Sequence, residues 1–178
     1  MDPAKQEQLD PGPLWLLGQA IRRERERQDV SQERFAWLFG LDRSYVGRVE
    51  RGEVNLTFRK LMVFIRALRA EPVTFFRDLH VDPHARRQVP QRKPLPRAVN
   101  DLSTMVGLAV MKERQWAGLT QEELADKAGV ARSYISWLEC GRRNPTFAQL
   151  MRILESLGVE PAEFFQHFPL PPKKRTSK

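Results

Sequence analysis

The sequence contains a single cysteine, Cys140, and no long apolar run. One cysteine excludes an internal disulfide and is typical of proteins that work in a reducing cytosol. No segment approaches the ~18 consecutive apolar residues of a transmembrane helix. The N-terminal stretch MDPAKQEQLDPGP is polar and partly acidic, which is not the pattern of a secretory signal peptide. We therefore expect a cytoplasmic protein, nucleoid-associated when bound to DNA, without a membrane partner.

Histidine is also scarce, and the residue patterns of common catalytic sites are missing. His80, His84 and His167 have no cysteine partners at the spacing of zinc sites, which favours surface or packing roles. The sequence has no phosphate-binding loop and no nucleophile–base pair, and its paired carboxylates fall at the spacing of solvated helix faces. We expect no metal, no cofactor and no enzymatic activity.

What the sequence has in excess is positive charge. Its 30 Lys and Arg residues outnumber 22 Asp and Glu residues, for a net charge of +8. The excess lies in the first half, in residues 80–100 and in residues 169–178, whereas residues 101–168 are slightly acidic. Such a balance suits a nucleic-acid partner, although many basic proteins bind none.

The chain repeats itself. The segments DRSYVGRVERG (42–52) and ARSYISWLECG (131–141) lie 89 positions apart. At this offset residues 18–76 align with residues 107–165 without a gap, and 23 of the 59 pairs are identical. A gapless match of this length is an internal repeat, and two copies of about 65 residues suit two small domains rather than a solenoid.

Composition suggests where these domains begin and end. We expect a disordered segment at 1–13, a first domain at 14–79, a Pro/Arg-rich linker at 80–100, a second domain at 101–168 and a basic tail at 169–178. The tail leaves two alternatives open, a solvated end or a contact with a phosphate backbone. The linker reaches roughly 70 Å when fully extended, far enough for both domains to share one duplex.

Each domain is expected to be all-α, with five helices. In the second copy Thr120 and Glu123 form a capping box at the start of the second helix, and Thr146 and Gln149 begin the fourth helix in the same way. Gly129 ends the second helix because glycine tolerates the left-handed conformation. The second and third helices are thus joined by a short turn, which is the layout of a helix-turn-helix.

The segment TQEELADKAGVARSYISWLECGRRNPTFAQLMRIL resembles the phage-repressor/Cro type of helix-turn-helix domain, found in the XRE-like family of bacterial regulators. The segment SQERFAWLFGLDRSYVGRVERGEVNLTFRKLMVFI resembles a more diverged copy. Together the two copies cover nearly all of the chain that we expect to be ordered. The resemblance implies that the third helix of each domain enters the major groove of double-stranded DNA.

The resemblance implies DNA contacts at the start of the second helix, on the third helix, and in the loop leading to the fourth helix. In the first copy these residues are Gln32, Arg43, Ser44, Tyr45, Gly47, Arg48, Asn55 and Thr57. In the second copy they are Gln121, Arg132, Ser133, Tyr134, Ser136, Trp137, Arg142, Arg143, Asn144 and Thr146. Arginine can bond guanine in a bidentate way, so Arg43 and Arg48 are the expected base readers of the first copy. Trp137 stands where the first copy has Arg48, and it suits either thymine methyl groups or a protein interface.

The resemblance also implies an internal ion pair in each copy, Arg25 with Glu50 and Arg114 with Glu139, which orients the third helix. The expected function is a sequence-specific DNA-binding regulator of transcription with two non-identical recognition helices, acting as a repressor and autoregulator. The alternative is a protein-interaction module, an antitoxin or anti-activator, whose second domain binds a protein. The acidic balance of the second copy favours that alternative, and its arginines oppose it.

Apolar side chains at Trp37, Leu38 and Val63 occupy positions where the second copy has charged residues. They suit either packing against the N-terminal segment or the linker, or an interface with the other domain, a second copy of the chain or another protein. The acidic second helix of the second copy suits either a solvated helix face or a contact with RNA polymerase.

Overall fold

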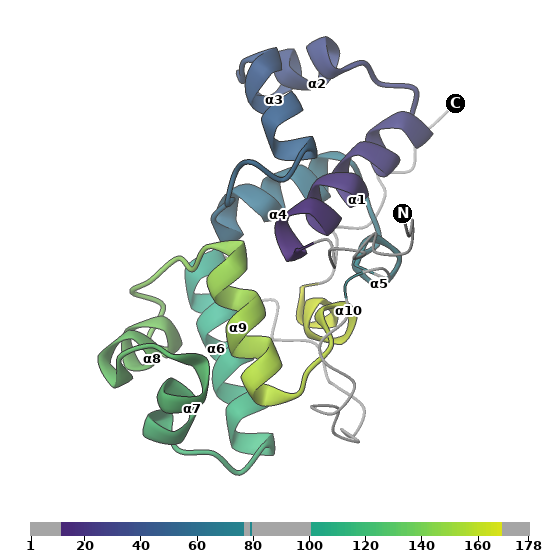
Figure 1. Ribbon diagram of the computed structural model, residues 1–178. Coiled ribbons are helices and arrows are strands. Elements are labelled where there is room, and N and C mark those ends of the chain that lie inside the picture. Colours follow the sequence, from purple (N-terminus) through teal and green to yellow (C-terminus); the bar gives the residue numbers. More distant parts are fainter. Residues whose placement is uncertain (1–11, 77–78, 80–100, 169–178) are drawn as a thin grey trace, which may run out of the picture.

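The computed structural model describes residues 12–76, 79 and 101–168, which form helices and their connections (Figure 1). The first repeat contains α1 (Pro13–Arg27), α2 (Gln32–Leu38), α3 (Arg43–Glu50), α4 (Phe58–Ala67) and α5 (Pro72–Phe75). The second contains α6 (Leu102–Trp116), α7 (Gln121–Ala128), α8 (Arg132–Glu139), α9 (Phe147–Leu157) and α10 (Pro161–Phe164), followed by the 3-10 turn η2 (Phe165–His167). The predicted all-α fold with two helix-turn-helix repeats is confirmed. Within the described part, no helix has the length and apolar character needed to cross a membrane.

The expected linker (80–100) and basic tail (169–178) lie outside the described residues, as does most of the N-terminal segment. Pro13, which we expected in that segment, is instead the first residue of α1. Proline suits this position because its φ is already helical and its missing N–H would have no partner within the helix.

The helix starts follow the chemistry of the capping residues. Thr120 Oγ1 accepts a hydrogen bond from Glu123 N (3.2 Å), and the Glu123 carboxylate accepts one from Thr120 N (2.7 Å). Thr146 and Gln149 form the same capping box on α9, so both predicted boxes are confirmed. In the first repeat Ser31 accepts a bond from Arg34 N (3.1 Å), and Arg34 provides no carboxylate to reach back.

The capping box makes a quantitative prediction for the second repeat. Thr120→Ala is expected to lower the free energy of unfolding by about 1 kcal/mol, since it removes the acceptor of the Glu123 backbone N–H. Ser31→Ala should cost a similar free energy in the first repeat, because it removes the acceptor of the Arg34 N–H. Urea unfolding of both variants measures the losses, and an unchanged stability of Thr120→Ala would argue against the cap.

The first and third helices of each repeat pack with their backbones close together. A Cβ atom at Gly18 on α1 would lie 2.5 Å from the carbonyl oxygen of Glu50 on α3. In the second repeat a Cβ atom at Gly107 would clash in the same way with the carbonyl oxygen of Leu138. Only glycine permits so close an approach. This contact explains why both copies have glycine at this position.

The two repeats are also joined to each other by a reciprocal backbone contact. Phe58 N donates to Pro145 O (2.8 Å), and Phe147 N donates to Leu56 O (2.7 Å). These bonds flank an antiparallel bridge between the N-cap residues of α4 and α9. Each bond is the counterpart of the other at the repeat offset of 89. Such reciprocity is characteristic of a two-fold interface.

Asparagine side chains extend the same junction. Asn55 Oδ1 accepts a hydrogen bond from Ala148 N (3.1 Å), and Asn144 Oδ1 accepts one from Arg59 N (3.1 Å). These two bonds are again counterparts at the repeat offset. The Arg59 guanidinium also reaches the Asp101 carboxylate at 3.3 Å, which adds an exposed ion pair between the repeats.

Phenylalanine side chains from both repeats form one core across the junction. The rings of Phe76 and Phe165 stack with 3.9 Å between centroids. Phe58 lies 5.9 Å from Phe165, and its counterpart Phe147 lies 6.3 Å from Phe76. All four side chains are buried. In Figure 1, α4 and α9 accordingly lie near the middle of the molecule, with α2–α3 at one end and α7–α8 at the other. The repeats thus form a pseudo-two-fold dimer within one chain through direct packing, whereas the sequence indicated only a Pro/Arg-rich linker between them.

Candidate nucleic-acid interface

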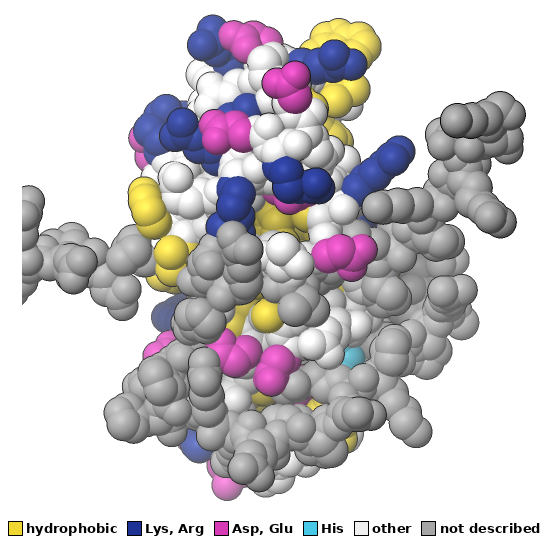
Figure 2. Space-filling view, turned by 90° about the vertical axis from the view of Figure 1, so that its right-hand side faces the viewer, with side chains coloured by type: hydrophobic (Ala, Val, Ile, Leu, Met, Phe, Trp, Pro, Cys, Tyr) yellow, Lys and Arg dark blue, Asp and Glu magenta, His cyan; other side chains and the backbone are white. Residues whose placement is uncertain are grey.

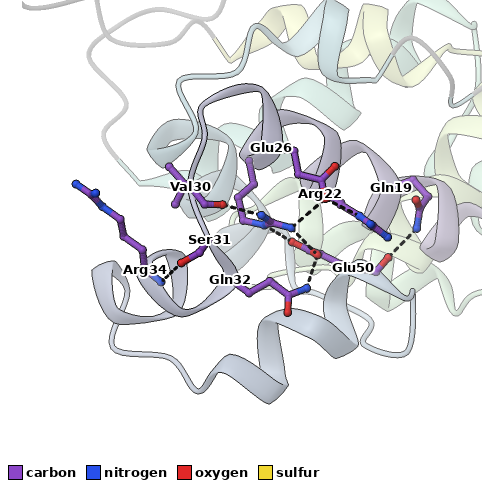
Figure 3. A network of polar contacts seen from close by, with 9 residues as sticks. Gln19, Arg22, Glu26, Val30, Ser31, Gln32, Arg34 and Glu50 are labelled. Atoms are coloured by element: carbon purple, nitrogen blue, oxygen red, sulfur yellow. Dashed lines mark hydrogen bonds and ion pairs between the residues drawn. The ribbon is translucent and has the colours of Figure 1, made fainter.

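The third helix of each repeat, α3 or α8, is held by a buried polar network that Figure 3 shows for the first repeat. Arg25 Nε and Nη2 donate to the two carboxylate oxygens of Glu50 at 2.6 and 3.1 Å, and Arg25 Nη1 donates to Val30 O at 2.6 Å. Gln32 Nε2 donates to Glu50 Oε2 at 2.7 Å. The bond to Glu50 raises the pKa of the Arg25 guanidinium above its ordinary value. The network ties α1, the turn after it, α2 and α3 together.

The second repeat has the same network. Arg114 Nε and Nη2 donate to Glu139 at 2.6 and 3.0 Å, and Arg114 Nη1 donates to Leu119 O at 2.7 Å. Gln121 Nε2 donates to Glu139 Oε2 at 2.7 Å. The Nε2 groups of Gln32 and Gln121, which the resemblance placed among the DNA contacts, each donate one hydrogen bond within the protein and so brace the third helix.

The N-termini of α3 and α8 differ between the repeats. Asp42 Oδ1 accepts a hydrogen bond from Ser44 N (2.8 Å) and caps α3, whereas Ala131 gives α8 no side-chain cap. The bond from Ser44 lowers the pKa of the Asp42 carboxyl. Ser44, Arg132 and Ser133 are all exposed at these helix starts, where a recognition helix meets base edges.

The exposed arginines of the first repeat form ion pairs with nearby carboxylates. Arg43 Nη1 lies 2.7 Å from Glu33 Oε1, and Arg48 Nε lies 3.6 Å from Glu53 Oε2. Arg51 Nε lies 2.6 Å from Glu53 Oε1. Exposed pairs of this kind contribute only ~0–1 kcal/mol, so the guanidinium groups remain free to exchange a carboxylate for a DNA phosphate or a guanine edge.

Gly47 was expected at an exposed, base-facing position, and this expectation is wrong. Gly47 is buried, and a Cβ atom there would lie 3.3 Å from Arg51 Nη1 and 3.8 Å from Gln32 Oε1. The equivalent residue of the second repeat, Ser136, is half-buried. The sequence did not place Arg51 among the expected DNA contacts, because the second copy has Cys140 at the equivalent position and the repeat gives no sign of a basic residue there.

The face of the second repeat combines an aromatic ring with cations. Trp137 is 42% exposed, and the guanidinium carbon of Arg143 lies 4.8 Å from the centre of its ring. Such cation–π pairs add modest stability at exposed sites. Tyr134 OH donates to Gln149 Oε1 at 3.2 Å, and burial raises the pKa of the Tyr134 phenol. In the first repeat the ammonium group of Lys60 lies 5.4 Å from the ring of Tyr45 instead.

Four predicted contact residues have another use in the structure. Asn55 and Asn144 accept the hydrogen bonds that join the repeats, and Thr57 and Thr146 cap α4 and α9 beside the same junction. These bonds occupy side-chain oxygens as acceptors, whereas a DNA phosphate would be bound by N–H or O–H donors of the same side chains. Their DNA contacts stay a prediction. Arg142 is exposed in the same loop of the second repeat.

The apolar side chains that the sequence singled out are exposed, with Trp37 at 79%, Leu38 at 54% and Val63 at 44%. Figure 2 shows hydrophobic side chains at the upper end of the molecule, where α2 lies. No contact within the described chain covers Trp37. A protein interface at these residues stays a prediction.

The histidines show no metal-binding arrangement among the described residues, which contain no group of three or more His, Cys, Asp or Glu side chains placed to hold an ion. His167 is buried, and its Nε2 lies 2.9 Å from Glu113 Oε1. His167 therefore has a packing role, as expected, whereas His80 and His84 lie outside the described residues.

Comparison with known proteins identifies matches to both repeats. A family model described as a helix-turn-helix domain matches residues 16–75, and one described as helix-turn-helix matches residues 110–164. The chain is 41% identical over 63 residues to the uncharacterized HTH-type transcriptional regulator y4dJ of Sinorhizobium fredii (strain NBRC 101917 / NGR234), which covers 35% of this chain and 82% of the relative. It is 40% identical over 53 residues to control protein C.SmaI of Serratia marcescens, covering 30% of this chain and 63% of the relative. The chain is also similar to the solved structure of the wild-type restriction-modification controller protein C.Esp1396I, with 36% sequence identity and a TM-score of 0.37. That alignment covers 39% of this chain and 88% of the controller protein.

Proposed function

The chain belongs to the XRE-type helix-turn-helix family of DNA-binding transcriptional regulators, and we propose that it binds one DNA duplex with both recognition helices, α3 and α8. The observation that carries this proposal is the reciprocal junction between the repeats. It supports a fixed spacing between α3 and α8, which are braced by the same Arg–Gln–Glu network. A protein with two such helices reads half-sites about one DNA turn apart, ~34 Å.

The two half-sites differ because the exposed residues differ. The first repeat presents Arg43 and Arg48, which suit guanine O6 and N7. The second presents Arg132 with Trp137 under Arg143, which suits a guanine beside a thymine methyl group. A pseudo-dimer with unlike halves therefore fits an asymmetric operator better than a palindrome.

The mode of regulation that we propose is repression, including control of the protein's own promoter. A regulator that covers two adjacent turns of promoter DNA excludes RNA polymerase from the same sequence. The exposed arginines of both repeats, together with the net charge of +8, support tight binding through phosphate neutralisation.

One observation favours a second candidate function for the second repeat, a protein-binding role as in an antitoxin or anti-activator. Trp137 exposes 42% of its surface on α8, and α8 has no N-cap side chain. Exposed tryptophan is typical of protein interfaces. The two functions differ in their salt dependence, because a phosphate-contacting surface loses affinity steeply as salt rises.

A footprint on the DNA upstream of the protein's own gene tests the proposal with full-length variants. Because the repeats share a core, each recognition helix is disabled by substitution: Arg43→Ala with Arg48→Ala, or Arg132→Ala with Arg143→Ala. We expect the intact chain to protect two adjacent turns and each double variant to lose protection on one side. If the second double variant leaves the footprint unchanged, the second repeat does not read DNA, and the protein-binding function replaces it.

Arg48→Ala alone is expected to cost ~1–3 kcal/mol of binding free energy on the best site, because it removes one bidentate base contact. Preference at one base position should relax at the same time. Arg66→Ala is the matched control, since Arg66 is an exposed arginine of α4 outside the proposed interface. Competition binding measures both variants, and an equal loss on random DNA would contradict the base-reading role of Arg48.

A further inference from the structure

The C-terminal end of α3 in the first repeat has a carboxylate shared by two arginines. The two carboxylate oxygens of Glu53 accept hydrogen bonds from Arg51 Nε (2.6 Å) and Arg51 Nη2 (3.1 Å). Glu53 Oε2 also lies 3.6 Å from Arg48 Nε. All three side chains are exposed. The proposed base reader Arg48 is therefore linked through Glu53 to Arg51, which is not among the proposed DNA contacts.

Gly47 provides the space that the Arg51 side chain occupies. A Cβ atom on Gly47 would lie 3.3 Å from Arg51 Nη1, which is tighter than most contacts of a Cβ atom. The two residues are four positions apart and therefore neighbours on one face of the helix. The Arg51 guanidinium thus lies over Gly47, one turn back along α3, and from there it binds the Glu53 carboxylate.

The second repeat lacks this cluster of Gly47, Arg48, Arg51 and Glu53 altogether. The four equivalent positions hold, in the same order, Ser136, Trp137, Cys140 and Arg142. The second repeat thus has a positive charge at the position where Glu53 gives the first repeat a negative one. The buried Arg–Gln–Glu network, by contrast, is the same in both repeats. The fold of a repeat therefore does not need a carboxylate at the position of Glu53.

A carboxylate on a DNA-binding surface repels phosphates and so lowers the affinity for DNA of any sequence. The hydrogen bond from Arg51 lowers the pKa of the Glu53 carboxyl, which keeps Glu53 ionised at neutral pH. Glu53 lies at Nε of Arg48 and leaves both Nη groups, which bond no described residue, for guanine O6 and N7. The pair is weak in water, and its attraction grows when DNA displaces the surrounding water.

We propose that Glu53 is a positioning residue that sets the sequence specificity of the first repeat by orienting Arg48. The inference rests on the proposed binding of DNA by α3. A guanine contact through the Nη groups of Arg48 keeps the pair with Glu53, whereas a phosphate contact through Nε must displace the carboxylate. Arg51 holds Glu53 in place through its two hydrogen bonds. The carboxylate thus lowers overall affinity and penalises incorrect sequences most, which increases discrimination.

Competition binding of full-length Glu53→Gln to the best site and to random-sequence DNA tests this role. We expect the Kd for random-sequence DNA to fall about 2–5-fold, because one negative charge fewer faces the phosphates. The ratio of the random-sequence Kd to the best-site Kd should fall roughly 3–10-fold, because Arg48 loses its orientation. Preference should relax at the same base position as in Arg48→Ala. The thermal unfolding midpoint should not change, since an exposed ion pair contributes little stability.

Glu24→Gln is the matched control, because it removes a carboxylate that pairs with Arg27 on α1, outside the proposed DNA contacts. It should change both Kd values by the same factor. In an Arg48→Ala background, Glu53→Gln should leave the specificity ratio unchanged. The inference is overturned if Glu53→Gln leaves the ratio of the wild-type chain unchanged, or lowers it equally without Arg48. Either result leaves the proposed function standing, whereas a wild-type chain that binds all sequences equally overturns both.

Discussion

Phe165→Ala is expected to lower the free energy of unfolding by about 3–5 kcal/mol and to uncouple the two repeats. The Phe165 side chain is 0% exposed, and its ring stacks on Phe76 at 3.9 Å and faces Phe58 at 5.9 Å. Both of these neighbours belong to the other repeat. Removing the ring therefore opens a cavity at the centre of the junction. Urea unfolding followed by tryptophan fluorescence measures the loss.

The control for this variant is Phe35→Ala, which should cost a similar free energy without uncoupling the repeats. Phe35 is 2% exposed, and its ring contacts, Phe39 at 4.8 Å and Phe64 at 5.4 Å, stay within the first repeat. Phe165→Ala should broaden or split the unfolding transition and reduce protection of the two-turn DNA site. Unchanged joint protection in a folded Phe165→Ala chain would show that the aromatic junction does not set the spacing of the recognition helices.

The two repeats are joined by direct contacts as well as by the polypeptide chain. A flexible tether raises the effective concentration of the second domain but leaves its orientation free. The reciprocal bonds between Phe58 and Pro145 and between Phe147 and Leu56 fix orientation as well. The entropic cost of ordering the two proposed recognition helices relative to each other then falls on folding and not on DNA binding. This raises the affinity for DNA.

Local features of the fold could be predicted from the sequence because their causes are local. A threonine followed three residues later by Glu123 or Gln149 forms a capping box whatever else surrounds it. The Arg–Glu pairs followed from the family pattern and lie where the family places them, Arg25 against Glu50 and its counterpart in the second repeat. Left-handed turns were predictable where glycine marks them.

The junction could not be predicted because each of its parts has an ordinary local explanation. Phe58 and Phe147 fit the apolar stripe of α4 and α9, so their periodicity gives no sign that they meet rings from the other repeat. Asn55 and Asn144 lie in a loop that the family uses for DNA contacts, and this likeness concealed their bonds across the junction. Arg69 has a positive φ of +46°, and the sequence marks it only through its alignment with Gly158 at the repeat offset.

Glu139→Ala is expected to destabilise the second repeat by about 3–5 kcal/mol, because it strands a charge that the fold has buried. Glu139 is 3% exposed at its side chain and accepts hydrogen bonds from Arg114 Nε and Nη2 and from Gln121 Nε2. Without the carboxylate, the Arg114 guanidinium, 13% exposed, keeps only the backbone oxygen of Leu119. Glu50→Ala should act in the same way on the first repeat. Chemical unfolding of the two variants measures both losses.

The double variant Arg114→Met with Glu139→Leu separates two free energies: the cost of the stranded charge and the net stabilisation by the ion pair. Replacing both partners by apolar residues of similar size should restore most of the stability, because an ion pair inside a protein contributes little beyond the cost of desolvating it. DNA affinity should stay low in the same variant, since Gln121 has lost its acceptor and α8 its orienting bonds. A double variant as unstable as Glu139→Ala would mean that the pair itself holds the fold. One that regains full DNA affinity would mean that packing alone orients α8.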